Sequence, residues 1–166
     1  MVAPLYAQLH LFADLTPAQN TIVEQLFVPI RMASGDIVFL QGDPAEYLYI
    51  VIEGEISIQF KPDDGPPLTI ARIKPEGVLG WSAALGSPEY TSSAVCEADC
   101  TLLRISGEDL RNLCDRYPET GSYVLERLAE VIAKRLRNTH TQVLALLEQG
   151  MQAGLSKTIE AHKVVH

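Results

Sequence analysis

Side chains that could perform chemistry are few in this chain of 166 residues, and they are poorly grouped. No Gly-x-Ser-x-Gly elbow, P-loop, His-Glu-x-x-His or Cys-x-x-Cys motif occurs in the sequence. No histidine occurs between residues 28 and 105, which excludes a metal-dependent enzyme built on His-rich strands there. The sequence therefore predicts a protein that is not an enzyme and that requires no metal or other cofactor.

Three cysteines and two histidines near the C-terminus are the remaining candidates for redox or metal chemistry. Cys96 and Cys100 are four residues apart in a strand-like region and could share a face, but structural zinc usually needs four Cys or His ligands. We expect both, together with Cys114, to be buried free thiols, with redox sensing as the alternative. His162 and His166 would clip a metal only in a helix, and we expect a mobile end there.

The charge balance disfavours nucleic acid as a partner. The 13 Lys and Arg against 21 Asp and Glu give a formal net charge of −8, whereas DNA binding relies on cations that neutralise phosphates. We interpret the one basic cluster, Lys134, Arg135 and Arg137, as a solvated helix face. No apolar run approaches the roughly 18 residues that span a bilayer, and no signal peptide is visible. We therefore expect a cytoplasmic protein that binds neither DNA nor a membrane.

The order of the expected elements predicts a mainly β fold with helices at both ends. A helical lead covers residues 5–27, with Thr16 as the N-cap and Pro17 at the first helical position. Residues 28–105 contain short apolar runs separated by Gly, Pro and Asp turns, a pattern typical of a jelly-roll β-barrel. Helices follow over residues 107–149. We expect a single domain over residues 1–150 and a flexible tail over residues 151–166.

The last expected helix is long enough to suggest a second subunit. It runs from about Thr120 to Glu148, about 29 residues or about 44 Å. Its apolar residues recur every three to four positions and form a seam for another helix. They are Leu125, Leu128, Ile132, Leu136, Val143 and Leu146. Because such a helix is longer than the barrel that it would cover, we predict a homodimer through Leu128, Ile132, Leu136 and Val143. The alternative is that the seam packs on its own domain.

Glycine and aromatic spacing in the first strands carries a family resemblance. Gly35, Val38-Phe39 and Gly42-Asp43, followed by the apolar run at residues 47–52 and then Gly54, resemble the cyclic nucleotide-binding domain family. The resemblance covers about residues 5–147 and implies helices, an eight-stranded jelly roll, a short helix and a long one. In the transcriptional regulators of this family a DNA-reading domain comes next. Here 16 residues follow position 150, against roughly 60 for a small domain, so we expect the DNA-binding domain to be lacking.

The resemblance also places a phosphate-binding cassette at residues 77–94. In the family, a Glu after a glycine accepts a hydrogen bond from the ribose 2′-hydroxyl, and an Arg pairs with the cyclic phosphate. Here Trp81 and Ser82 follow Gly80, so the ribose carboxylate is absent.

Counting back from the strand at residues 103–106 puts Tyr90 at the family's arginine position, between Glu89 and Thr91. No Lys or Arg occurs between Lys74 and Arg104. Hydrogen bonds to charged groups contribute roughly 1.5–3 kcal/mol each, so losing two would weaken cyclic nucleotide binding about 10²–10⁴-fold. An ionised Glu89 would repel a phosphate further.

The candidate ligand-binding residues are therefore neutral donors and apolar groups at the cassette positions. They are Leu79, Gly80, Trp81, Ser82, Ala83, Tyr90, Thr91 and Ser92. On the base side the resemblance adds Arg135 and Thr139 of the long helix. Trp81 is expected either to fill the pocket or to stack on a less anionic ligand, and Tyr90 to cap the rim of the barrel if it is not a ligand contact.

These observations together predict a non-catalytic regulatory protein that senses a small ligand through a degenerate cassette and acts on a separate output partner. Two alternatives stay open. One is a genuine regulator that binds cAMP or cGMP, and the other is a dimeric interaction scaffold whose pocket is filled.

Overall fold

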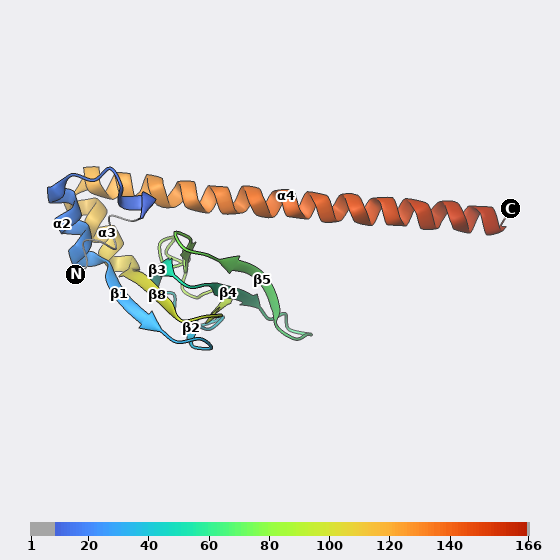
Figure 1. The fold of residues 1–166 in the computed structure, drawn as a ribbon, viewed down its shortest axis with the longest axis horizontal. Coiled ribbons are helices and arrows are strands. Elements are labelled where there is room, and N and C mark those ends of the chain that lie inside the picture. Colours follow the sequence, from blue (N-terminus) through green and yellow to red (C-terminus); the bar gives the residue numbers. More distant parts are fainter. Residues whose placement is uncertain (1–8, 166) are drawn as a thin grey trace. The chain divides into compact units, whose positions relative to one another are not determined.

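The computed structural model describes the backbone of residues 9–165. The side chains of Thr139, Gln142, Val143 and residues 151–165 lie outside the described part. The elements in chain order are η1 (His10–Phe12), α2 (Pro17–Leu26), β1 (Val28–Met32), β2 (Ile37–Phe39), β3 (Tyr47–Glu53), β4 (Ile56–Phe60), β5 (Leu68–Ile73), β6 (Val78–Leu79), β7 (Ser93–Cys96), β8 (Cys100–Ser106), α3 (Gly107–Arg116) and α4 (Pro118–Val165). Figure 1 labels the three α-helices and most of the strands.

The eight strands form two antiparallel sheets of four, with the strand orders β1-β8-β3-β6 and β2-β7-β4-β5. This architecture confirms the predicted jelly roll of about eight strands flanked by helices. The apolar runs that the sequence placed in residues 28–105 became these strands, since β-branched and aromatic side chains pack well on a pleated surface. Positive φ angles at Gly35, Gly42 and Gly54 make the turns between the early strands.

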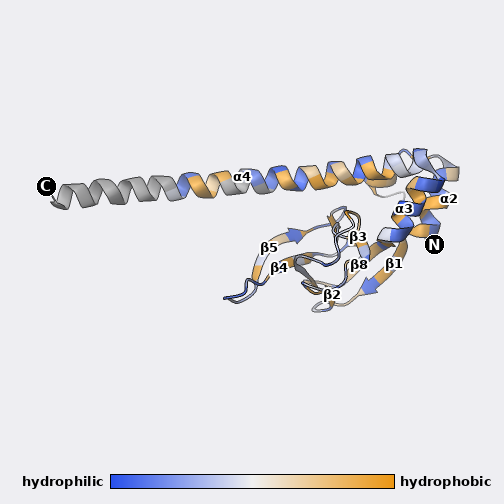
Figure 2. Cartoon of the chain, turned by 180° about the vertical axis from the view of Figure 1, so that it is seen from behind, coloured by the Kyte–Doolittle hydropathy of each residue, from blue (hydrophilic) through white to orange (hydrophobic). Residues whose placement is uncertain are grey.

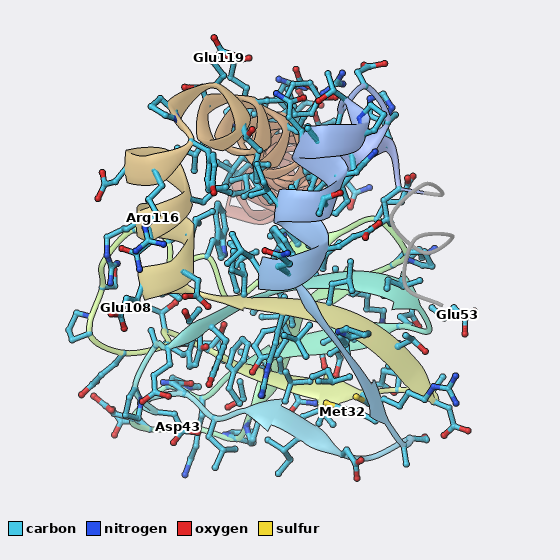
Figure 3. All side chains as sticks on the ribbon, turned by 90° about the vertical axis from the view of Figure 1, so that its left-hand side faces the viewer. Met32, Asp43, Glu53, Glu108, Arg116 and Glu119 are labelled. Carbon is cyan, nitrogen blue, oxygen red and sulfur yellow. The ribbon has the colours of Figure 1, made fainter. Side chains whose placement is uncertain are left out.

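Strands β3 and β8 bury both of their faces. One face points into the roll, where Tyr49 and Val51 of β3 join Leu102 of β8 in one core cluster. The other face carries Leu48 and Ile50, which are buried as well. Figure 3 shows helices α2 and α3 on this outer side of the sheet to which β1 and β8 belong. The sheet β1-β8-β3-β6 therefore lies between the interior of the roll and a helical layer.

Local capping fixes the helix starts that the sequence indicated. Thr16 accepts a hydrogen bond from the amide of Gln19 at 3.2 Å, and the Gln19 side chain accepts one from the amide of Thr16 at 3.0 Å. This capping box confirms Thr16 as the N-cap, with Pro17 at the first helical position. Ser106 caps α3 in the same manner by accepting from the amide of Asp109 at 3.0 Å.

Helices α3 and α4 cross closely at Gly121. A Cβ atom added there would lie 2.6 Å from the Cα of Cys114, so only glycine permits the approach. Thr120 and Val124 near the start of α4 are buried, and so is Leu128 at 3% exposure. Leu128 is therefore already covered by its own domain, and it has to be removed from the predicted intersubunit seam.

Helix α4 is longer than the sequence predicted. It continues past Glu148 to Val165, so residues 151–165 carry helical backbone instead of the expected tail. Gly150 and Gly154 are the glycines of that stretch, and each weakens a helix by about 1 kcal/mol relative to alanine. The residues between them favour helix. Figure 2 shows apolar and polar residues interspersed along the described length of α4. The chain divides into two compact units within this helix, Met1–Leu128 and Ala129–His166.

The cysteines are free, as the sequence predicted. Cys96 and Cys100 come from different strands, β7 and β8, but join the same buried cluster. Burial, and then the neighbouring Cys100, raise the pKa of the Cys96 thiol to about 12, so the reactive thiolate is disfavoured. Cys114 is partly buried.

Candidate functional site

The cassette begins with a turn that only glycine can make. Gly80 has a φ of +75°, and a Cβ atom there would lie 2.7 Å from the carbonyl oxygen of Tyr47. The chain then closes a compact turn, in which the amide of Ala83 donates to the oxygen of Gly80 at 3.1 Å and the amide of Leu85 donates to the oxygen of Trp81 at 3.0 Å. The segment forms turns and no α-helix.

Tyr90 occupies the interior of the roll and not its rim. Its side chain is 5% exposed, and its ring stacks on Phe39 with 3.8 Å between centroids and 14° between planes. The Tyr90 hydroxyl donates to the carbonyl oxygen of Tyr47 at 2.6 Å and accepts from the amide of Tyr47 at 3.0 Å. Burial raises the pKa of Tyr90 to about 12. The residue at the predicted arginine position is therefore a neutral phenol whose hydroxyl is committed to the backbone.

The loop that precedes β3 holds the backbone of Tyr90 as well. The amide of Tyr90 donates to the oxygen of Asp43 at 2.9 Å, and the amide of Gly42 donates to the oxygen of Tyr90 at 2.9 Å. Figure 3 labels Asp43 on this loop. Glu89 forms an isolated bridge with Pro44 and is exposed, so its carboxylate faces solvent.

The other predicted cassette residues divide between the core and the surface. Leu79 and Ala83 are buried at 1% and 2% exposure, and Leu79 belongs to the same core cluster as Tyr90. Trp81, Ser82 and Ser92 are partly buried, and Thr91 is exposed. Within the described residues, Trp81 is not a member of the core cluster, so the aromatic side chain that fills the roll near the cassette is Tyr90.

Sequence reasoning missed one charged side chain in this neighbourhood, Arg104 on β8. Arg104 pairs directly with Tyr49 of β3, and it lies two residues after Leu102. Both of these residues belong to the interior cluster, so Arg104 extends from the inward face of its strand. Its guanidinium carbon lies 4.4 Å from the centroid of the Tyr47 ring. No sequence signal assigns Arg104 to this face, because its neighbours Leu102 and Leu103 are both apolar.

An interaction with Tyr49 completes the surroundings of Arg104. Burial raises the pKa of Tyr49, and the charge of Arg104 together with a hydrogen bond between the two side chains opposes that rise. Tyr49 also lies near Phe39, with 6.0 Å between ring centroids. A partly buried cation therefore meets an aromatic cluster beside the Gly80 turn.

The predicted base-side residues belong to the second unit of the chain. Arg135 lies on α4 beyond Leu128, and the side chain of Thr139 lies outside the described residues. Their contact with a ligand stays a prediction. Among the described residues, no group of three or more His, Cys, Asp or Glu could hold a metal ion.

Comparison with known proteins is consistent with this fold. The sequence model of the cyclic nucleotide-binding domain matches residues 29–117. The CRP-like cAMP-activated global transcriptional regulator of Mycobacterium tuberculosis is 24% identical over 155 residues, which cover 93% of this chain and 67% of that protein. The cyclic AMP receptor protein of Thermus thermophilus is 29% identical over 133 residues, which cover 80% of this chain and 60% of that protein.

Among solved structures, a cyclic nucleotide-binding domain from Methylobacillus flagellatus has a TM-score of 0.75 at 20% identity, over 86% of this chain and 80% of that one. This likeness shows the fold. The chain spans about two thirds or less of the length of the two curated relatives.

Proposed function

Because the chain belongs to the cyclic nucleotide-binding domain family, we propose that it is a non-catalytic regulatory protein that senses a small ligand with a degenerate phosphate-binding cassette. The names of the relatives, a cAMP-activated transcriptional regulator and a cyclic AMP receptor protein, support a regulatory role. In this proposal the chain acts on a separate output partner, and its cassette does not hold a cyclic phosphate in the family's manner.

The observation that carries the proposal is the state of Tyr90. In this family an arginine at this position pairs with the cyclic phosphate. A tyrosine carries no positive charge in either protonation state, and burial, which raises the pKa of Tyr90 to about 12, keeps it neutral. Both hydrogen bonds of its hydroxyl go to the backbone of Tyr47. Turning Tyr90 out to serve a ligand would break them and would open the stack with Phe39.

Two other functions remain in competition. The compact turn after Gly80 and the partly buried Ser82 offer neutral donors, which favours a weak cyclic nucleotide regulator. The filled interior around Tyr90 and Phe39 favours a scaffold that acts only through protein contacts. The response to a nucleotide separates the first of these functions from the one proposed, and the response to another small ligand separates the second.

Calorimetric titration of the full chain with cAMP and cGMP tests the proposal. Starting from an assumed micromolar site, the loss of two charged contacts predicts affinities no better than the high micromolar range, about 10²–10⁴-fold weaker. Micromolar binding by the unmodified protein would overturn the degenerate cassette and establish the cyclic nucleotide regulator.

A pair of variants sharpens the same experiment. Tyr90→Arg combined with Glu89→Ser supplies a phosphate partner and removes a like charge, so cAMP binding should tighten measurably. Tyr90→Phe is the matched control, because it keeps the ring on Phe39 and adds no charge. Circular dichroism checks that each variant is folded. Equal cAMP affinity in a folded double variant and in the control would count against Tyr90 as the residue that replaces the phosphate partner.

A further inference from the structure

Arg104 brings a positive charge to the interior of a roll whose cassette positions, residues 77–94, contain no Lys or Arg. Its partner across the strands is Tyr49, which is 5% exposed, and its neighbour on the same face is the fully buried Leu102. The guanidinium lies over the ring of Tyr47 and is partly buried. It is therefore surrounded on these sides by apolar and aromatic groups.

No carboxylate among the described residues forms an ion pair with Arg104. The acid that acts electrostatically on Tyr49 and Tyr90 is Glu46, whose side chain is exposed. Charges that leave water are normally paired, since an unpaired one loses its hydration without compensation. In a chain with 21 acidic residues, an inward-facing, partly buried arginine without an acidic partner is open to a counter-ion from outside the protein.

The geometry of the guanidinium limits what that counter-ion can be. Arginine presents five N–H donors in a planar fork, and the residue directly opposite Arg104 on β3 is Tyr49, which offers one hydroxyl. Such a fork matches the two oxygens of a carboxylate or a phosphate. The Tyr47 ring holds the fork from one side and thereby reduces the freedom lost on binding.

We propose that Arg104, held by Tyr47 and Tyr49, is the binding site for the oxyanion group of this protein's ligand, a carboxylate or a phosphate. The inference rests on the proposed sensing function and names the chemistry of its site. In this arrangement the cation that binds the anion lies on strand β8. The arginine position of the cassette is occupied by Tyr90 and supplies no charge.

The test uses the full chain and two probes, sodium phosphate and sodium benzoate, with sodium chloride at equal ionic strength as reference. Nuclear magnetic resonance follows the Nε–H signal of Arg104, which is assigned by its absence in Arg104→Lys. We expect a saturating shift with at least one oxyanion and none with chloride. A saturating response to phosphate alone indicates a phosphate ligand, and a response to benzoate alone indicates a carboxylate. The absence of a saturating shift with both probes would overturn the proposal.

Thermal unfolding of the variants supplies a second readout. The oxyanion should raise the unfolding temperature of the wild type, and Arg104→Gln should weaken its binding about 10- to 100-fold. Arg72→Gln is the matched control, because Arg72 is exposed on β5 and its pair with Glu55 at 3.8 Å lies on the other sheet. An unchanged response in Arg104→Gln would sink the proposal. If Arg104→Gln does not fold, Arg104→Lys, which keeps the charge and loses the fork, should still bind more weakly than the wild type.

The two proposals fail separately. Tight cAMP binding by the wild type overturns the degenerate cassette, and the same titration of Arg104→Lys then reports whether that binding uses Arg104. Conversely, weak cAMP binding together with an Arg104 signal that ignores both oxyanions leaves the degenerate cassette intact and removes the oxyanion site.

Discussion

Two side chains near the cassette, Tyr90 and Arg104, differ in how far the protein itself uses their polar groups. Tyr90 stacks on Phe39 and bonds to both backbone groups of Tyr47, so its contribution is to hold strands β2 and β3 together. Arg104 forms no ion pair with a carboxylate of the described residues. The phenol therefore serves the stability of the roll, and the guanidinium is available for recognition.

The raised pKa of Tyr90 predicts a loss of stability in alkali. An unfolded tyrosine ionises near pH 10, whereas Tyr90 in the fold ionises near pH 12. The folded state therefore holds this proton more tightly, and its contribution of about 2–3 kcal/mol is present below pH 10 and lost between pH 10 and 12. Urea unfolding at pH 8 and at stepwise higher pH measures it.

Tyr90→Phe provides the control for that experiment. The variant should be less stable than the wild type at pH 8 by about 1–3 kcal/mol, because two backbone groups of Tyr47 lose their partner. Between pH 10 and 12 the two proteins should converge in stability. A constant difference across that range would mean that Tyr90 ionises as it does in the unfolded chain.

The sequence located Tyr90 but not the direction of its side chain. Tyr90 lies in no strand, whereas its partners Phe39 and Tyr47 lie on β2 and β3. The contact with Tyr47 spans 43 positions, which a local sequence pattern does not report. Arg104 was missed for a related reason. Strand β8 buries Leu103 as well as Leu102, so alternation of apolar residues could not tell which face pointed into the roll.

At the scale of elements, a polar cluster ties the N-terminal segment to helix α4. Arg127 donates to a carboxylate oxygen of Asp14 at 2.6 Å, lies 3.0 Å from a ring nitrogen of His10 and covers the Tyr123 ring at 5.1 Å. The amide of His10 in turn donates to Glu76 at 2.7 Å. The arginine therefore links segments more than 100 positions apart, within the first unit of the chain.

Replacing Arg127 should loosen this connection. The Arg127 side chain is 19% exposed, so Arg127→Ala removes packing on Tyr123 as well as charge. The Asp14 side chain is 68% exposed, and solvent therefore reduces the contribution of the ion pair to stability. We expect a destabilisation of about 1–2 kcal/mol in urea unfolding. Lys134→Ala is the control, since Lys134 is exposed on the same helix and should change stability by less than about 0.5 kcal/mol. Equal effects would show that the cluster contributes nothing.

The sequence predicted element boundaries correctly where neighbouring residues determine them, and incorrectly where distant contacts or helix length determine them. Thr16, Pro17 and Ser106 marked helix starts through capping, which depends on neighbours in sequence. The end of α4 was placed too early because Gly150 weakens a helix without ending it. The burial of Leu128 was not visible either, since an apolar stripe does not show which of its members face their own domain.

At the scale of the whole molecule, the net charge of the chain disfavours nucleic acid as a partner, whereas the exposed leucines of α4 favour a protein. The net charge of −8 opposes association with nucleic acid phosphates. No helix in the described part of the chain is long and apolar enough to cross a membrane. In contrast, several leucines of α4 are largely exposed. They are Leu125, Leu136, Leu144, Leu146 and Leu147. A protein surface is the partner that such a stripe fits best.

For these exposed leucines we predict a homodimer through the part of α4 that lies in the second unit of the chain. The seam now rests on Ile132 and Leu136, because Leu128 is covered within its own domain and the Val143 side chain lies outside the described residues. Leu136 is 55% exposed in the single chain, so Leu136→Asp should not disturb the first unit. Burying an unpaired carboxylate between two helices costs several kcal/mol, which should convert a dimer to a folded monomer.

Light scattering coupled to size exclusion measures this change directly. Asn138→Asp is the matched control, because it adds the same charge at an exposed polar position of the same helix and should leave the mass unchanged. The melting curve of the Leu136→Asp roll should match that of the wild type at low concentration, since the first unit ends at Leu128. A wild type that is monomeric, or a Leu136→Asp variant that stays dimeric, would remove Leu136 from any interface between copies. A self-association seam is then lost as the explanation for the exposed leucines.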